Sequence, residues 1–291
     1  MSDKRLTYVT STLNKLPYLK VSLEHLIKNK KSDEEILVAD GGSTDGTKQY
    51  LENLYRQGNI DGYLSEKDFG ESHALNKLFL RAKGELITLI TDDDAFDFTV
   101  INKCRTFMQE NPKIDILGTN GAKKNQNTNS NIVLMDYAND YNTWVKINKP
   151  FMFCGLGIMF RTSSLPILGL WGIGFARADA EYTLRITSGK GVLAWYTGPS
   201  FVNISNPQSI SRTQRQKIWY ETKKLRYFYL NERNLYPKFL IDLRAKIRIL
   251  RDKLIPKTNN GASEKWNFMF EKSLTWLTEQ NKSSHYTFIV K

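Results

Sequence analysis

Short apolar runs alternate with amphipathic segments along the first hundred residues. Leu6 to Thr10 is a run of β-branched and apolar residues, and apolar residues recur every three or four positions from Leu19 to Ile27. The first pattern predicts a strand and the second a helix. Further strands are predicted over 36–39, 63–64 and 86–90, and further helices around Leu51 and over 74–82. This alternation is typical of βαβ units, so the predicted fold class is α/β with a mostly parallel sheet flanked by helices.

The pattern is less regular after the first hundred residues. Residues 119–131 are rich in Asn, Lys and Thr, which predicts an exposed loop or hairpin connection. An apolar run predicts a buried strand over 151–160 and is too short to span a membrane. A helix over 179–188 and a strand over 192–196 are predicted to follow.

The C-terminal part of the sequence is strongly basic. Residues 212–257 contain 14 Lys or Arg against 4 Asp or Glu, and so hold most of the formal charge of +12. Within them, residues 238–255 have the apolar spacing of an amphipathic helix with a basic opposite face. Two interpretations stay open: a packed helical subdomain with a solvated face, and a contact with an anionic membrane surface. No nucleic-acid motif accompanies the charge, so we expect no nucleic-acid partner.

The composition is that of a globular protein. The sequence has 291 residues, 41% of them hydrophobic, which is enough for one large α/β domain with an appendage. Cys104 and Cys154 lie in apolar surroundings and are predicted to be reduced thiols, and no metal-binding cysteine spacing occurs. The first residues lack a signal-peptide pattern, so we expect a cytoplasmic protein.

One glycine-rich loop is close to the nucleotide-binding P-loop pattern. Residues 38–51 read VADGGSTDGTKQYL, with two glycines at the P-loop spacing. Thr47 and Lys48 stand in the wrong order for that motif, and Asp40 and Asp45 would repel a phosphate held between them. The loop therefore needs a function other than phosphate binding. Candidates for the N-cap of the following helix are Ser43, Thr44 and Asp45.

Acidic residues follow two of the predicted strands. Asp40 comes directly after one strand, and an acidic triplet, Asp92–Asp94, comes after another. The carboxyl ends of parallel strands meet at one edge of a sheet, so these acids should face the same crevice. Adjacent carboxylates repel one another unless a cation lies between them, and hard divalent cations prefer oxygen ligands. A solvated turn is the alternative, but the preceding apolar strand favours a metal site.

The motifs DGGSTDGT, SEKDFGESHALNKLFLRAKGELITLITDDD and ADAEYTLR occur in an order and spacing that resembles the family 2 glycosyltransferases with the GT-A fold. The opening TYVTSTLN also looks like that family's first strand and loop, with Ser-Thr-Leu-Asn at 11–14 in place of the usual Pro-Thr-Tyr-Asn. The resemblance covers about residues 5–211. It implies a GT-A domain over 1–211, followed by a basic, mainly helical region over 212–291.

The resemblance implies a nucleotide-sugar donor site. Asp40 matches the acid that hydrogen-bonds the nucleobase, and Lys77 could neutralise diphosphate charge as a point cation. His73 is expected to pack or hydrogen-bond rather than to bind a ligand. The residues assigned to donor binding are Thr10, Thr12, Asp40, Gly42, Ser43, Asp68, Asn76, Lys77, Asp92, Asp93 and Arg212.

The resemblance also implies a divalent metal, Mn²⁺ or Mg²⁺, at Asp92 and Asp94. Which two of the three acids contact it stays open. The family often carries a histidine near residues 203–212 that completes the metal site, and none is present here. The candidates to replace it are Asn203, Asn206 and Ser209; alternatively, aspartates, phosphates and water hold the metal alone.

Asp179 matches the family's general base. The glutamate that usually precedes this aspartate is Ala178 here, but the aspartate itself is kept. A helix N-terminus favours an ionised carboxylate, which keeps Asp179 ready to accept a proton. Glu181 is the alternative base. Trp171 just upstream is expected in a flexible acceptor loop, with ordinary packing as the other interpretation.

The implied reaction is inverting hexosyl transfer from a UDP-, GDP- or dTDP-sugar to a glycan or lipid-linked acceptor. Similar enzymes act in bacterial surface polysaccharide synthesis, which suggests a peripheral position at the inner face of the cell membrane; an oligomer is compatible with the sequence. A sugar-phosphate nucleotidyltransferase is a second hypothesis, although residues 10–17 lack its glycine-rich phosphate loop. A basic binding module without catalysis is a third.

Overall fold

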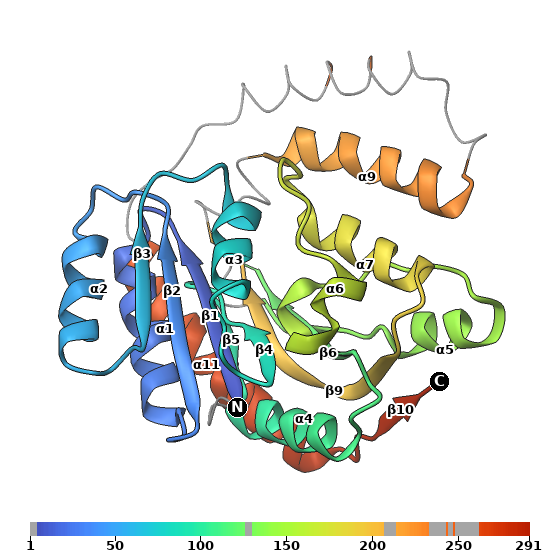
Figure 1. Cartoon of the computed structure of the whole chain (residues 1–291), viewed down its shortest axis with the longest axis horizontal. Coiled ribbons are helices and arrows are strands. Elements are labelled where there is room, and N and C mark those ends of the chain that lie inside the picture. Colours follow the sequence, from blue (N-terminus) through green and yellow to red (C-terminus); the bar gives the residue numbers. More distant parts are fainter. Residues whose placement is uncertain (1–4, 126–129, 207–213, 233–242, 244–246, 248–261) are drawn as a thin grey trace.

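The computed structural model describes residues 5–125, 130–206, 214–232, 243, 247 and 262–291 (Figure 1). Its strands are β1 (Leu6–Thr12), β2 (Glu34–Asp40), β3 (Gly62–Ser65), β4 (Leu86–Leu89), β5 (Ala95–Phe96), β6 (Ile116–Lys124), β7 (Ile132–Met135), β8 (Ile158–Arg161), β9 (Leu193–Ile204) and β10 (Phe288–Val290). Its α-helices are α1 (Leu16–Asn29), α2 (Thr47–Arg56), α3 (Glu71–Phe79), α4 (Phe98–Glu110), α5 (Ala138–Ile147), α6 (Leu165–Leu168), α7 (Ala178–Ser188), α9 (Arg215–Leu230) and α11 (Ala262–Ser283).

The strands of these described residues form one mixed sheet. Along its main path the order is β10-β9-β6-β8-β4-β1-β2-β3, with β5 pairing to β9 and β7 to β6. The pairings of β1 with β2 and β4, of β2 with β3, and of β6 with β9 are parallel, and β8 runs antiparallel between β4 and β6. Apart from β8 and β10, the strands of the main path therefore share one direction, as predicted.

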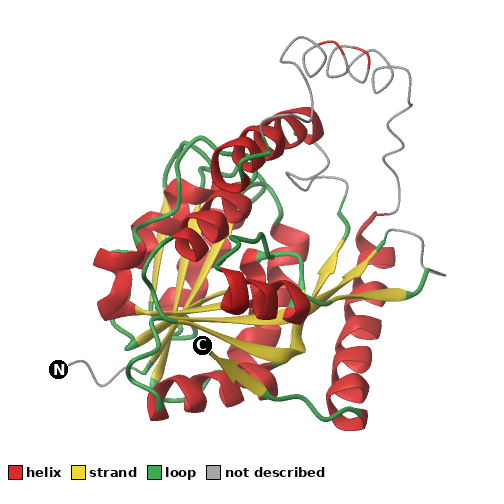
Figure 2. Cartoon of the chain, turned by 90° about the vertical axis from the view of Figure 1, so that its right-hand side faces the viewer, coloured by secondary structure: helices red, strands yellow, loops and turns green. Residues whose placement is uncertain are grey.

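Helices cover both faces of the sheet, as Figure 2 shows. Leu6 and Tyr8 of β1 pack with residues of α1, α2 and α4, whereas Val9 packs on the other face with residues of α3, α5 and α7. Side chains along a strand alternate between the two faces, and both faces are buried here. The near-continuous apolar runs of the first strands follow from this burial.

The order of strands and helices predicted up to residue 90 is confirmed, although the helix predicted over 74–82 lies at Glu71–Phe79 and β5 was not predicted. Among later segments, the strand predicted over 192–196 continues to Ile204, and two others differ more. The run 151–160 forms a strand only from Ile158, because Gly155–Gly157 is a 3-10 turn after an irregular stretch. Of the two predictions for 119–131, the exposed loop is wrong for the first part, since β6 continues to Lys124 and is mostly buried there, whereas the hairpin is confirmed by the antiparallel pairing of β6 with β7. Asn120 is satisfied inside the protein because its Nδ2 donates to Asp136 Oδ1 and to the Thr197 carbonyl.

The last thirty residues pack against the main sheet. β10 pairs antiparallel with β9, and Trp266 and Phe270 of α11 form a buried cluster with Tyr18 of α1 and Val202 of β9. The predicted amphipathic helix over 238–255 lies outside the described residues except for Leu243 and Ile247, which are exposed. Within the described part of the chain, no helix combines the length and the apolar character needed to cross a membrane.

Candidate functional site

The carboxyl ends of β1, β2 and β4 bring the predicted acids to one edge of the sheet. Thr12 at the end of β1 lies in register with Asp40 at the end of β2, and the acidic triplet follows β4. Asp40 and all three acids of the triplet are buried. The hydroxyl oxygen of Thr10, two residues before the end of β1, is also buried and has no hydrogen-bond partner among the described residues.

Asp40 is fixed by its own loop and by the neighbouring strand. Its Oδ1 accepts from the Ser43 backbone N–H at 3.0 Å, and its Oδ2 accepts from Ser65 Oγ at 2.7 Å. Gly42 has a φ of +88°, a conformation that L-residues with side chains rarely adopt. A glycine is therefore required at position 42 for the turn that brings the Ser43 backbone N–H to Asp40.

Asp45 has a structural role in the same loop. Its Oδ1 accepts from the backbone N–H of Thr47 at 3.2 Å, and its Oδ2 accepts from the backbone N–H of Leu16 at 2.9 Å. One carboxylate therefore holds the first residues of both α1 and α2. The N-cap of α2 is nevertheless Gly46, so the prediction of Ser43, Thr44 or Asp45 at that position is wrong, and Asp45 contacts the helix from the residue before the cap.

A lysine that the sequence analysis did not single out lies between two acids of the triplet. Lys15 Nζ is 3.0 Å from Asp92 Oδ1 and 2.9 Å from Asp93 Oδ2. Burial disfavours the ammonium ion, yet the charges of Asp92 and Asp93 outweigh it and raise the pKa of Lys15. Burial also raises the pKa of Asp92 and of Asp94 above the ordinary aspartate range. The signal in the sequence was the triplet itself, which needs a nearby positive charge.

Two asparagines contact the acids where the family often has a histidine. Asn203 Nδ2 donates to Asp94 Oδ1 at 3.1 Å, and the Ile204 backbone N–H donates to the same oxygen at 2.7 Å. Asn206 Nδ2 donates to Asp93 Oδ2 at 3.1 Å. Asn203 and Asn206 were both candidates to replace that histidine, whereas Ser209 lies outside the described residues.

The acid edge has the chemistry of a divalent-metal site that is completed by substrate. Lys15 is paired with Asp92 and Asp93, whereas Asn203 and the Ile204 backbone N–H donate to Asp94 without charge, so a dication would meet carboxyl oxygens that one ammonium group does not neutralise. Among the described residues, however, no three His, Cys, Asp or Glu side chains converge closely enough to hold an ion unaided. Mg²⁺ sites commonly use one or two carboxylates together with substrate phosphates and water. The residues fit a metal of that kind.

Asp179 lies in the first turn of α7. Its Oδ1 accepts from the Ala180 backbone N–H at 2.8 Å and lies 3.9 Å from Arg177 Nε. Burial raises the pKa of Asp179, and the Arg177 charge opposes that rise. The 3-10 turn Gly155–Gly157 contacts both α7 and β4, the strand that the acidic triplet follows.

The alternative base, Glu181, is engaged elsewhere. Its Oε1 accepts from Arg185 Nε at 2.8 Å, one helical turn further along α7, and its side chain is largely buried. This ion pair holds Glu181 against α7 itself, and Asp179 is the better placed of the two.

Three residues predicted at the donor site make contacts within the protein. Asn76 donates to the Trp171 carbonyl at 2.9 Å and accepts from the Trp171 backbone N–H at 2.9 Å, so its amide holds that loop. Lys77 Nζ forms an ion pair with Glu66 Oε1 at 2.8 Å. Asp68 Oδ1 accepts from the Gly70 backbone N–H at 2.8 Å and so shapes the loop before α3.

Trp171 is a core residue. Its ring lies 4.4 Å from that of Tyr182 and packs edge-on against Phe160, and it is buried. This supports the packing interpretation over a flexible acceptor loop. His73 accepts a hydrogen bond from the Phe69 backbone N–H at 3.2 Å, as expected for a structural histidine. Arg212 lies outside the described residues.

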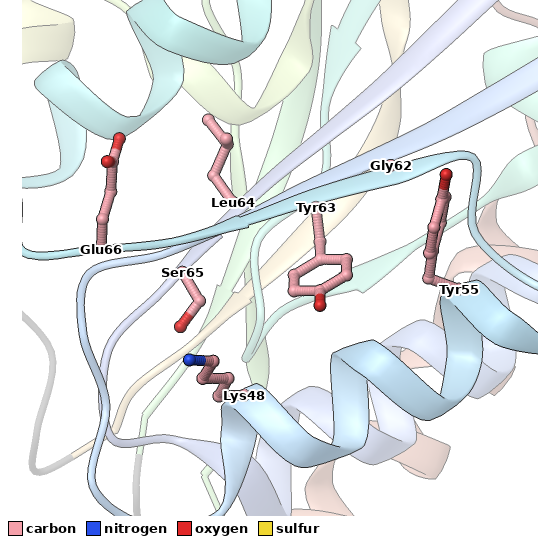
Figure 3. Close-up of a pocket in the computed structure, with 7 residues that line it drawn as sticks. All are labelled: Lys48, Tyr55, Gly62, Tyr63, Leu64, Ser65 and Glu66. Atoms are coloured by element: carbon pink, nitrogen blue, oxygen red, sulfur yellow. The ribbon is translucent and has the colours of Figure 1, made fainter.

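A cavity of about 480 Å³ lies away from this crevice, between α2 and the edge strand β3 (Figure 3). Lys48 and Tyr55 of α2 face Tyr63 and Ser65 of β3 across it. The cavity runs along the whole of β3 and reaches Ser65 and Glu66 at its carboxyl end. It connects to the acidic crevice through Ser65, whose hydroxyl donates to Asp40.

Comparison with known proteins identifies the family. The family model described as Glycosyl transferase family 2 matches residues 7–165. The chain belongs to glycosyl transferase family 2. Its sequence is 29% identical over 114 residues to Glycosyltransferase GlyG of Streptococcus pneumoniae serotype 4, a match that covers 39% of this chain and 38% of that protein. The family 2 chain thus spans well under half the length of this curated relative.

Solved structures share the fold of this family 2 chain at low sequence identity. S. aureus TarS 1–349 in complex with UDP-GlcNAc aligns with a TM-score of 0.57 and 14% identity, covering 96% of this chain and 92% of that one. The longer TarS crystal structure is matched over 49% of its length. Mannosyltransferase PcManGT from Pyrobaculum calidifontis, in complex with GDP-Man and Mn²⁺, aligns with a TM-score of 0.53 and 15% identity, covering 96% and 74%. The predicted GT-A fold is confirmed.

Proposed function

We propose that this chain is a metal-dependent, inverting glycosyltransferase that moves a sugar from a nucleotide-sugar donor to a hydroxyl group of a glycan or lipid-linked acceptor. The observation that carries the proposal is the buried acidic triplet, paired with Lys15 after β4, together with Asp179 in the first turn of α7, since the 3-10 turn Gly155–Gly157 contacts both β4 and α7. A diphosphate bound at the triplet and a hydroxyl group at Asp179 would bring donor and acceptor together. Membership of family 2 supports this reaction over a nucleotidyltransferase or a non-catalytic module.

In this reaction Asp179 acts as the general base. The contacts of its carboxylate fall on Oδ1, so Oδ2 is the oxygen that we assign to the acceptor proton. As that proton moves to Asp179, the acceptor oxygen bonds to the anomeric carbon and the bond to the nucleoside diphosphate breaks on the opposite face. The configuration of the sugar is therefore inverted. A general base contributes typically about 10²- to 10⁴-fold to such a step.

The acidic triplet and Lys15 handle the charge of the diphosphate. Asp92 and Asp94, with Asp93 beside them, would hold Mn²⁺ or Mg²⁺, whose positive charge stabilises the departing diphosphate. Asn203 holds Asp94 in place, and Asn206 does the same for Asp93. Lys15 keeps the triplet folded as a unit and supplies a further cation at the crevice.

The donor nucleobase is assigned to the loop after β2. Asp40, with Ser43 and Ser65 holding both of its oxygens, offers a pre-oriented acceptor for a base N–H. The related structures named above contain UDP-GlcNAc or GDP-Man, so UDP-, GDP- and dTDP-sugars are the donors to test. Thr10, Thr12 and Gly42 line the same edge of the sheet.

We assign the acceptor to a membrane-bound or surface glycan, with the protein peripheral at the inner face of the cell membrane. α9 supports this because Lys217, Lys224, Tyr227 and Phe228 are exposed on it, a mixture of cations and aromatics that suits an anionic lipid interface. Replacing Tyr227 and Phe228 of α9 by Ser should weaken binding to liposomes that contain anionic lipid. Replacing the exposed Phe69, which lies in the loop before α3, by Ser should not. Equal binding by both variants would remove α9 from the membrane contact.

A donor screen tests the reaction. The protein is mixed with UDP-, GDP- and dTDP-sugars and Mn²⁺, and released nucleoside diphosphate is measured. Asp179→Asn should lower turnover by about 10²-fold or more while donor binding, followed by thermal shift, is kept. Asp140→Asn is the matched control because Asp140 is an exposed acid in the first turn of α5. Near-normal turnover by Asp179→Asn would remove Asp179 from the role of base.

A further inference from the structure

The helix that carries Asp179 has no N-terminal cap of its own. α7 begins at Ala178, and the side chain of the preceding Arg177 makes no capping hydrogen bond. The first N–H groups of a helix lack partners within the helix and need an acceptor from elsewhere. For α7 this matters more than usual, since the proposed base is its second residue.

Glu221 of α9 supplies acceptors just before that helix. Its Oε2 accepts from the backbone N–H of Ala176 at 2.8 Å and from that of Arg177 at 3.0 Å. Glu221 is only 9% exposed, so its carboxylate is largely shielded from water and the two N–H groups replace water as its hydrogen-bond donors. Lys217 Nζ lies 3.8 Å from the other oxygen, Oε1, one turn earlier on α9.

Two more contacts of α9 fall on the same segment. Thr222 Oγ1 accepts from Arg177 Nη1 at 3.0 Å, so Arg177 is held by α9 at both its backbone and its side chain. One turn after Glu221, Leu225 is buried against Ala180 and Leu184 of α7. Figure 1 shows α9 lying along α7 in this way.

We propose that Glu221 is a positioning residue for the catalytic base, because it holds the backbone segment that leads into α7 from a different helix. By fixing the backbone at 176–177 it sets the direction in which Asp179 projects and the place of Arg177 beside Asp179 Oδ1. A base that is displaced by about 1 Å can lose roughly 10²-fold in rate. The role rests on the proposed function in that Asp179 must be the base. Glu221 lies outside residues 7–165, the segment that the family model matches, so a residue beyond that segment would help to position the active site.

The test separates positioning from general stability. Glu221→Ala should lower kcat by about 10²-fold with the donor KM within about threefold of wild type, and should speed amide hydrogen exchange in the segment 173–181. The matched control is Glu232→Ala, which breaks the ion pair between Glu232 Oε2 and Nε of Arg226 in α9 (2.7 Å). Among the hydrogen bonds and ion pairs of the described residues, none joins Glu232 to α7. The control should keep both kcat and the exchange rate of 173–181 near wild type.

Several outcomes would overturn the proposal. They are a wild-type kcat in Glu221→Ala, equal losses in Glu221→Ala and Glu232→Ala, or unchanged exchange at 173–181. If Glu221→Ala does not fold at the assay temperature, Glu221→Gln decides. Its neutral oxygen keeps the two hydrogen bonds but weakens them, so a kcat several-fold below wild type and faster exchange are expected, and wild-type values for both refute the role. If the wild type itself transfers no sugar, the proposed function fails; an active wild type with an unaffected Glu221→Ala removes the positioning role alone.

Discussion

Removal of the Lys15 ammonium gives the most direct test of the charge balance at the acidic triplet. Lys15→Met keeps the length and apolar stem of the side chain and deletes the positive charge. In the wild type this charge lies 3.0 Å from Asp92 Oδ1 and 2.9 Å from Asp93 Oδ2. All three side chains are largely buried, so water cannot replace the lost partner without a rearrangement.

The expected loss of stability follows from these two contacts. Each hydrogen bond between charged groups contributes about 1.5–3 kcal/mol, and breaking a buried ion pair by removing one partner costs about 3–5 kcal/mol. We expect about 3 kcal/mol, at the lower end, because the carboxylates can take up a proton or a metal ion. For a chain of this size that corresponds to a fall in Tm of roughly 6–12 °C.

The loss should depend on pH. Burial raises the pKa of Asp92 and of Asp94 in the folded protein above their values in the unfolded chain. A carboxyl group with a raised folded pKa binds its proton more tightly when folded, so its contribution to stability is present at low pH and is lost as pH rises through the folded pKa. Without Lys15 the pKa of Asp92 rises further. The deficit of Lys15→Met should therefore be smaller near pH 5 than near pH 8.

The assay is thermal unfolding with EDTA and with Mn²⁺, at both pH values. Mn²⁺ should raise the Tm of Lys15→Met more than that of wild type. The ammonium group that competes with the ion is gone, and a ligand that binds the folded state more tightly stabilises it more. Lys28→Met, which removes an exposed lysine at the end of α1, is the control. A Tm for Lys15→Met equal to that of wild type in EDTA near pH 8 would refute this account of the triplet.

Three further predictions concern the base, the metal and the C-terminal helix. Because burial raises the pKa of Asp179, kcat/KM should fall as pH drops through a value above the ordinary aspartate pKa, and a pH profile that stays flat down to that ordinary value would contradict it. Asn203→Leu removes the side-chain donor to Asp94 and should weaken Mn²⁺ binding by about 10- to 100-fold in a calorimetric titration; unchanged affinity would exclude Asn203 from orienting this acid. Trp266→Ala should lower the free energy of unfolding by about 3–5 kcal/mol in denaturant, because Trp266 is buried. It should also weaken Mn²⁺ binding, because Trp266 Nε1 donates to the Asp93 carbonyl at 3.1 Å. A loss of stability with unchanged Mn²⁺ affinity would show that α11 does not support the metal site.

Much of the fold and of the acid edge could be predicted because the signals are local. A strand buried on both faces needs an apolar run such as Ile36 to Ala39, and the residue that ends it, Asp40, then lies at the carboxyl edge whatever the rest of the chain does. Asp179 could likewise be placed in a first helical turn. By contrast, burial of the second half of β6 was not predicted, because the partners that satisfy buried Asn120 are distant in sequence.

What only the tertiary structure decided are the partners of these acids. Lys15 meets Asp92 across 77 residues, Glu221 reaches Ala176 across 45, and Trp266 lies under Asp93 from 173 residues away. A single sequence shows that three adjacent aspartates need a counter-charge, but many lysines could supply it in this basic chain. The sequence by itself determined the strands and which residues end them, because backbone geometry repeats every two or every three to four residues. That Lys15, Glu221 and Trp266 complete the site depends on contacts between residues far apart in the sequence. The periodic pattern of apolar residues within one helix or strand does not specify such contacts.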